Sequence, residues 1–133
     1  MSYIADYTNS YDIRGQRITI TAPARFDENT GKVIADLELD DHAAKLALEK
    51  YRRKFDIISP TDLKTLRHHW NFSQEKFAEF LGWNVATIAL YEAGALPSIS
   101  DNRLLKILIK IQNLWKNLLK IVKKKNYKRD LCL

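Results

Sequence analysis

The ionisable side chains that could act as acids, bases or metal ligands are few and scattered along this sequence. His42 has no second ligand near it, and His68 and His69 are adjacent, so on a helix they face different directions. The single cysteine, Cys132, excludes an internal disulfide and a zinc site built from cysteines. We also find no nucleophile–base pair, no phosphate-binding glycine loop and no paired carboxylates at a defined spacing. We therefore expect no catalytic residue, no metal and no cofactor, in a protein that is not an enzyme.

The most informative pattern lies between Leu63 and Gly94. Ser73 is placed to cap a helix, Gly82 to make a turn, and Asn84 to cap the helix that follows. Ala78 is small, as a close crossing of two helices requires. This spacing predicts a helix-turn-helix unit, in which the last helix would enter the major groove of DNA. Leu81, Ile88 and Tyr91 are expected to fill its core, and Leu63 and Leu66 to form the apolar side of the helix before it. The alternative is an ordinary antiparallel bundle with accidental spacing.

Arg67 and Glu92 could be read as functional groups, but the helix-turn-helix arrangement brings them together. We expect them to form a structural ion pair. His68, His69 and Trp70 are expected at a partly exposed helix end.

The elements before this unit are expected to be strands and then a helix. Arg17–Thr21 alternates apolar and polar residues, and Lys32–Ala35 is a plausible partner strand across the loop Asp27–Gly31. Arg14-Gly15 looks like a turn. Such a hairpin needs a third strand from residues 3–13, or a helix, to cover it.

From Asp40 the apolar period becomes helical. Asp40 or Asp41 would cap a helix whose apolar face contains Ala44, Leu48, Tyr51 and Phe55. Ser59-Pro60 starts a second helix that should stop near Asn71, and three more are expected at roughly 74–81, 85–92 and 101–123. The fold class is therefore α+β, mainly α. The expected domains are a β-rich module (1–39), a linking helix (40–58), a helix-turn-helix domain with a long C-terminal helix (59–123) and a basic tail (124–133).

The charge is distributed unevenly. The 22 basic and 16 acidic residues give a net charge of +6, but residues 1–58 and 59–100 each have −1 and residues 101–133 have +8. The tail could contact phosphates or an acidic partner, or simply be a solvated helix end. No apolar run approaches the length of a membrane span, and the N-terminus does not resemble a signal peptide. With one cysteine, a cytoplasmic location is expected.

The last helix has apolar residues in a heptad pattern. Leu104, Leu105 and Leu108 are expected to cover the helix-turn-helix core. The remainder would form a homodimer contact through Ile111, Trp115, Leu118 and Val122. The alternatives are a helix packed wholly within one chain and a basic amphipathic helix lying on an anionic membrane.

Four stretches together resemble a known family: Glu38–Asp41, Tyr51–Pro60, Phe77–Trp83 and Thr87–Pro97. They are similar to the MqsA/YgiT-type antitoxins and their prophage relatives, over roughly residues 11–110. This resemblance implies an N-terminal β-module, a DNA-binding domain of the Xre type, a dimer, a partner toxin and repression of the protein's own operon. In that family the β-module binds zinc, but here Asp27 and Thr30 stand where cysteine ligands would be.

The resemblance also implies which residues meet DNA. Base edges would be reached from Val85, Ala86 and Leu90, none of which forms side-chain hydrogen bonds. Gln74, Asn84 and Thr87 would set the position on phosphates. The leading hypothesis is an antitoxin-like transcriptional regulator. The alternative is a protein-binding neutraliser, or a phage-type counter-defence adaptor, that keeps the helix-turn-helix as a scaffold. A nucleic-acid-modifying enzyme is a third reading, opposed by the lack of a catalytic constellation.

Overall fold

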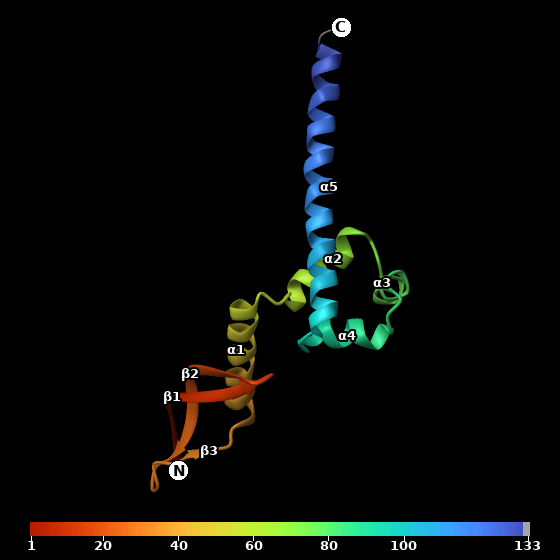
Figure 1. The fold of residues 1–133 in the computed structure, drawn as a ribbon. Helices are drawn as coiled ribbons and strands as arrows, with labels where there is room; N and C mark the ends of the chain where they lie inside the picture. Colours follow the sequence, from red (N-terminus) through yellow and green to blue (C-terminus); the bar gives the residue numbers. More distant parts are fainter. Residues whose placement is uncertain (132–133) are drawn as a thin grey trace. The chain divides into compact units, whose positions relative to one another are not determined.

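The computed structural model describes the backbone of residues 1–131 and the side chains of residues 1–125. Over this range the chain is α+β and mainly α, as the sequence predicts, with a three-stranded antiparallel sheet followed by five helices (Figure 1). It divides into two compact units, the N-terminal unit Met1–Asp56 and the C-terminal unit Ile57–Leu133. The elements are β1 (Ser2–Ile13), β2 (Gln16–Asp27), β3 (Val33–Ile34), α1 (Leu37–Phe55), α2 (Pro60–His69), α3 (Gln74–Leu81), α4 (Val85–Ala93) and α5 (Ile99–Leu131).

The sheet is built on a long hairpin of β1 and β2. Each strand has twelve residues, and the pairing runs from Ser2↔Asp27 to Ile13↔Gln16. Arg14 and Gly15 form the turn with φ of 50° and 79°, the left-handed pair that a two-residue hairpin of this type requires. The prediction of Lys32–Ala35 as a partner strand is confirmed in part: β3 pairs antiparallel with β2, but it has two residues and lies opposite Arg25 and Phe26 rather than Arg17–Thr21. The third strand expected from residues 3–13 is β1, which pairs with β2 along its whole length.

The helix α1 packs on β2 and belongs to the N-terminal unit, so it is not the separate linker that we expected. It begins at Leu37 rather than after Asp40, because Asp36 is the cap: its Oδ1 accepts a hydrogen bond from Leu39 N at 3.1 Å. Arg25 Nε on β2 donates to the other Asp36 oxygen at 2.7 Å. This ion pair fixes the start of α1 against the sheet.

The buried face of α1 also differs from the predicted one. Ala47 and Tyr51 are buried, whereas Ala44 and Leu48 are half-buried and Phe55 is exposed. Ala47 lies one helical turn before Tyr51, so the buried face of α1 is rotated slightly from the predicted apolar face. Together with Ile18, Ala22 and Ala24 of β2, these side chains form the core of the N-terminal unit.

The core of the C-terminal unit is made by α2, α3, α4 and the first part of α5, with α2 and α4 drawn beside α5 and α3 further from it (Figure 1). α2 begins as predicted, with Ser59 as cap and Asp62 completing a capping box. The buried cluster consists of Ile58, Leu63, Leu66, Phe77, Ala78, Ile88 and Leu105.

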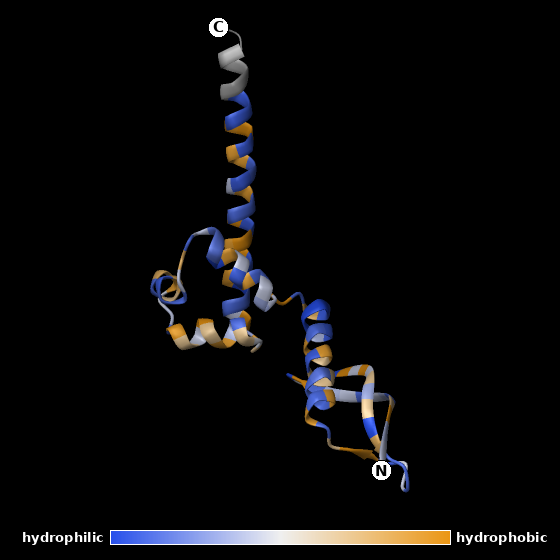
Figure 2. Cartoon of the chain, turned by 180° about the vertical axis from the view of Figure 1, so that it is seen from behind, coloured by the Kyte–Doolittle hydropathy of each residue, from blue (hydrophilic) through white to orange (hydrophobic). Residues whose placement is uncertain are grey.

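The first part of α5 meets this core differently from the prediction. Leu105 is fully buried and Leu108 is half-buried in contact with the cluster, but Leu104 is 37% exposed. Beyond Gln112 the described part of α5 leaves α2–α4 behind, and apolar residues continue along it (Figure 2).

Asp36 makes the stability of the N-terminal unit dependent on pH. The hydrogen bond from the Arg25 side chain, and then the one from the Leu39 amide, lower the pKa of the Asp36 carboxyl. Because the folded pKa is below the unfolded one, the stabilisation is present above the unfolded value of about 4 and is lost as the pH falls through the folded value. We expect Asp36→Asn to destabilise this unit at pH 7 and to flatten its acid dependence. Urea unfolding followed by tyrosine fluorescence between pH 2 and 7 measures both; equal pH profiles for the two proteins would contradict the assignment.

Candidate nucleic-acid interface

The helices α3 and α4 follow each other across a short turn at Gly82–Asn84, and local side chains set each boundary. Ser73 Oγ accepts a hydrogen bond from Lys76 N at 3.1 Å, and Asn84 Oδ1 accepts one from Ala86 N at 2.9 Å. Gly82 ends α3 with a left-handed φ of 72°, and Trp83 N then donates to Ala78 O at 2.8 Å. The predicted caps of both helices are confirmed.

The crossing of the two helices is closed by the residues expected there. Phe77, Ala78 and Ile88 are buried, while Leu81 and Tyr91 are half-buried and pack on this cluster from its edge. Tyr91 also meets Trp83 edge-on, with ring centroids 6.1 Å apart. The position of α4 is therefore fixed by contacts on its inner side.

The Arg67–Glu92 ion pair is confirmed. Arg67 Nη2 and Nε donate to the two oxygens of Glu92 at 2.8 and 3.1 Å, a bidentate pair whose side chains are only 12% and 3% exposed. Arg67 Nη1 donates to Phe72 O at 2.9 Å in the loop before α3. Gln74 Nε2 lies 3.4 Å from Glu92 Oε2. The amide of Gln74, which was expected to meet phosphates, is thus directed toward this buried pair.

The outer face of α4 is apolar. We use this name for Val85, Ala86, Ala89, Leu90 and Ala93, all of them exposed. Leu90 is 60% exposed and Val85 is 39% exposed. Of the other candidates, Thr87 is half-buried and Asn84 uses its side-chain oxygen as the helix cap. The structure therefore brings Asn84, Val85, Ala86 and Leu90 to the start and outside of one helix.

Sequence reasoning missed Phe80 of α3, which is 63% exposed. It contacts Phe72, with ring centroids 5.6 Å apart, at the α2–α3 loop. The signal that could have found it is its position one residue before Leu81, outside the inward-facing period of α3. The charged side chains of α3, Glu75, Lys76 and Glu79, are exposed.

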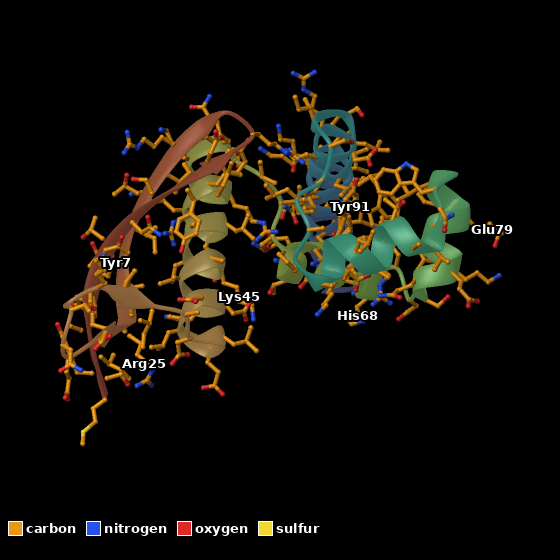
Figure 3. The ribbon with its side chains drawn as sticks, turned by 90° about the horizontal axis from the view of Figure 1, so that it is seen from below. Tyr7, Arg25, Lys45, His68, Glu79 and Tyr91 are labelled. Atoms are coloured by element: carbon orange, nitrogen blue, oxygen red, sulfur yellow. The ribbon has the colours of Figure 1, made fainter. Side chains whose placement is uncertain are left out.

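Tyr91 connects α4 to the start of α5. Its hydroxyl donates to Asp101 Oδ2 at 2.7 Å, and in Figure 3 it lies within the C-terminal unit while Glu79 points away from it. Burial, and then the hydrogen bond to Asp101, raise the pKa of the Tyr91 hydroxyl. The hydroxyl therefore stays protonated and keeps donating at neutral pH.

The histidines lie at the surface and are not brought together. His42, His68 and His69 are exposed, and His69 stacks edge-on with Trp70. Across the part of the chain that the structure describes, no three His, Cys, Asp or Glu side chains are grouped so that they could hold a metal ion. Asp27 and Thr30 instead accept hydrogen bonds from the amides of Asn29 and Lys32, at 2.8 and 3.3 Å, in the turn between β2 and β3.

Comparison with protein-family models and with curated proteins finds no match to this chain. None of the helices in the described residues has the length and apolar character needed to cross a bilayer.

The buried pair leads to a prediction about stability. Glu92→Leu leaves the Arg67 charge buried without its partner, so we expect it to destabilise the C-terminal unit by about 3–5 kcal/mol. The double variant Arg67→Met/Glu92→Leu removes both charges and should recover most of that loss. Thermal and urea unfolding followed by circular dichroism at 222 nm test this. A double variant no more stable than Glu92→Leu would show that the cost is not the unpaired charge.

Proposed function

We propose that this protein is a DNA-binding transcriptional regulator of the helix-turn-helix class that acts as an antitoxin-like repressor of its own operon. The observation that carries the proposal is the α3–α4 pair, with each cap formed by a local side chain and α4 held by a buried ion pair. This is the arrangement in which a second helix is presented to the major groove.

The outer face of α4 would make apolar contacts in the groove. Side chains such as Val85, Ala86 and Leu90 can pack on thymine methyl groups but cannot bond to guanine or adenine edges. Asn84 and Thr87, at the start of α4, would meet phosphates through their side chains. Specificity then comes from methyl groups and DNA shape more than from hydrogen bonds.

Affinity would come largely from residues 101–133, which comprise the long C-terminal helix and the basic tail. The segment 59–100 has a net charge of −1, so it supplies little attraction to phosphates, whereas residues 101–133 have +8. A cluster of lysines bound to phosphates gives affinity that does not depend on sequence and falls steeply with salt.

The N-terminal unit would bind the partner protein through its sheet. β1 is an edge strand in the order β1-β2-β3, and it extends over twelve residues that include neither Pro nor Lys. Natural edge strands are usually protected by such residues or by other charges, and β1, whose charged residues are Asp6 and Asp12, keeps a long edge that is suited to adding a strand from a partner. Tyr3 and Ile4 of β1 are 43% and 54% exposed beside it.

A second candidate is a protein-binding neutraliser that uses the helix-turn-helix as a scaffold. The exposure of Leu90 and Phe80, 60% and 63%, favours it, because large exposed apolar side chains are typical of protein contacts.

DNA binding is tested with a variant of the outer face of α4. Ala86→Glu adds a carboxylate in the first turn of α4, where it suits the helix dipole and leaves the fold intact. Facing phosphates, it should weaken binding to the DNA upstream of the gene by about 10- to 100-fold. Fluorescence anisotropy with a labelled duplex, at 100 mM and 200 mM salt, measures the affinity.

The matched control is Asn113→Glu, which adds the same charge at an exposed site of α5 outside the motif. It should bind almost as the unchanged protein does. If the unchanged protein binds upstream and random DNA equally, the operator-binding proposal fails. If a co-expressed partner protein is then lost on Leu90→Arg, the neutraliser is the correct reading.

Removing residues 123–133 separates the two sources of affinity. We expect binding to upstream and random DNA to weaken by the same factor, because lysines bound to phosphates do not read sequence. The slope of log affinity against log salt should become shallower by about 0.9 for each phosphate that the shortened chain no longer neutralises. Anisotropy titrations over a salt series give both values; an unchanged slope would exclude the tail from the interface.

A further inference from the structure

The helix α5 carries two parallel apolar stripes, which only the folded chain distinguishes. The outer stripe consists of Leu104, Ile107, Ile111, Leu114, Leu118 and Ile121, and the core stripe of Leu105, Leu108, Gln112, Trp115, Leu119 and Val122. In each stripe the steps along the chain are 3, 4, 3, 4 and 3, the heptad spacing of packed helices.

The two stripes differ in what covers them. The outer stripe is exposed from end to end, from 37% at Leu104 to 69% at Leu114. The core stripe is covered in its first half, where Leu105 and Gln112 are 0% and 3% exposed, but its second half is not: Trp115, Leu119 and Val122 are 50%, 40% and 45% exposed. One chain therefore leaves nine apolar side chains of these two stripes uncovered.

Between Leu104 and Ile121 the charges of α5 lie away from the centre of the outer stripe. At 100° per residue, Lys106, Lys116 and Lys120 lie on other sides of the helix, while Arg103 and Lys110 flank the stripe, where long side chains can extend to water. Lys125 follows Ile121 at the spacing of the stripe, so a charge stands where the apolar part of the stripe ends. A neighbouring helix centred on the outer stripe would therefore meet apolar side chains. The area is also sufficient: nine half-exposed side chains offer on the order of 600–700 Å² per chain, close to the ~800 Å² per partner of a stable interface.

We propose that α5 pairs with α5 of a second copy of this chain in an antiparallel arrangement, with the outer stripes facing each other. The stripe has the same spacing in both directions, so an antiparallel partner places every apolar residue opposite another. Leu104 then meets the partner's Ile121, Ile107 its Leu118, and Ile111 its Leu114. Each layer combines one Leu with one Ile, which pack with alternating shapes.

Two further features select this direction. In an antiparallel pair, the far half of each α5 runs beside the partner's C-terminal unit, which covers Trp115, Leu119 and Val122. A parallel pair would leave these three exposed. It would also place the two runs Lys123–Lys125 side by side within one Debye length, whereas the antiparallel pair separates them.

This arrangement refines the dimer contact expected from the sequence. The predicted set of Ile111, Trp115, Leu118 and Val122 mixes the two stripes. Ile111 and Leu118 belong to the helix–helix contact, whereas Trp115 and Val122 pack on the partner's C-terminal unit. The interface does not depend on whether the protein binds DNA.

The oligomeric state of the full chain tests the proposal. Sedimentation equilibrium at 1–50 µM, a range spanning typical association constants, should give a dimer for the unchanged protein. Leu114→Glu and Leu118→Glu lie beyond the monomer core, so they should give folded monomers with an unchanged circular dichroism spectrum. Asn113→Glu, with the same charge on the other side of α5, should remain a dimer. A monomeric unchanged protein would overturn the proposal, and so would a dimer that both outer-stripe variants retain.

The direction is tested by disulfide mapping. Ile107→Cys and Leu118→Cys are introduced together in a Cys132→Ser background and oxidised in air. Within one helix these positions are about 16 Å apart along the axis, too far for a disulfide. A tryptic fragment joining residue 107 to residue 118 supports the antiparallel pair, and fragments joining like positions overturn it.

Binding to vesicles that contain anionic lipid tests the other occupant of the outer stripe. A monomeric chain that binds these vesicles, and loses binding in Leu118→Glu, would overturn the dimer and assign the stripe to a lipid surface.

Discussion

The C-terminal unit depends on one interaction, the buried pair of Arg67 and Glu92. The arginine comes from α2 and the glutamate from α4, and the same guanidinium binds the carbonyl of Phe72 in the loop before α3. Three elements of the motif thus meet at one planar group. Removing two charges from water is expensive, and it is tolerated only where the hydrogen bonds are nearly complete. The geometry of these bonds therefore acts together with the packing of Leu63, Phe77 and Ile88 to fix the position of α4.

The outer face of α4 and the basic residues of the chain lie in different segments. Its outer face carries no ionisable group, and the basic residues that could attract DNA are concentrated in α5 and the tail. For the proposed DNA binding, long-range attraction and local recognition would be properties of different segments, with different salt dependence. The discriminating contacts of that complex would be short-ranged and apolar, so shape complementarity would decide between DNA sequences.

The sequence predicted the helices of the C-terminal unit closely, because their limits are set by neighbours in the chain. Ser59, Ser73 and Asn84 each cap a helix within three residues of themselves, and Gly82 ends one by its own backbone conformation. The helix-turn-helix pattern, which spans about thirty residues, paired Arg67 with Glu92. The prediction failed in the N-terminal unit, where no such pattern specified which segments pair. β2 had two possible partners, and only the folded chain shows that β1 takes the full ladder. Asp36 was missed as a cap, since its selection over Asp40 depends on Arg25 across the sheet.

The stripes of α5 show the same limit and explain why the predicted dimer contact mixed two surfaces. A heptad count cannot distinguish a side chain that covers its own core from one on the adjacent stripe, since both recur at the same spacing. Burial makes the distinction: Leu105 and Gln112 are covered within the chain, while Leu104 and Ile111, one residue earlier in each case, are open. Once the core has taken the first half of one stripe, the second half of that stripe has no cover of its own. The apolar side chains in that second half are buried only if another compact unit packs on them. In the proposed antiparallel dimer, the C-terminal unit of the second copy packs there.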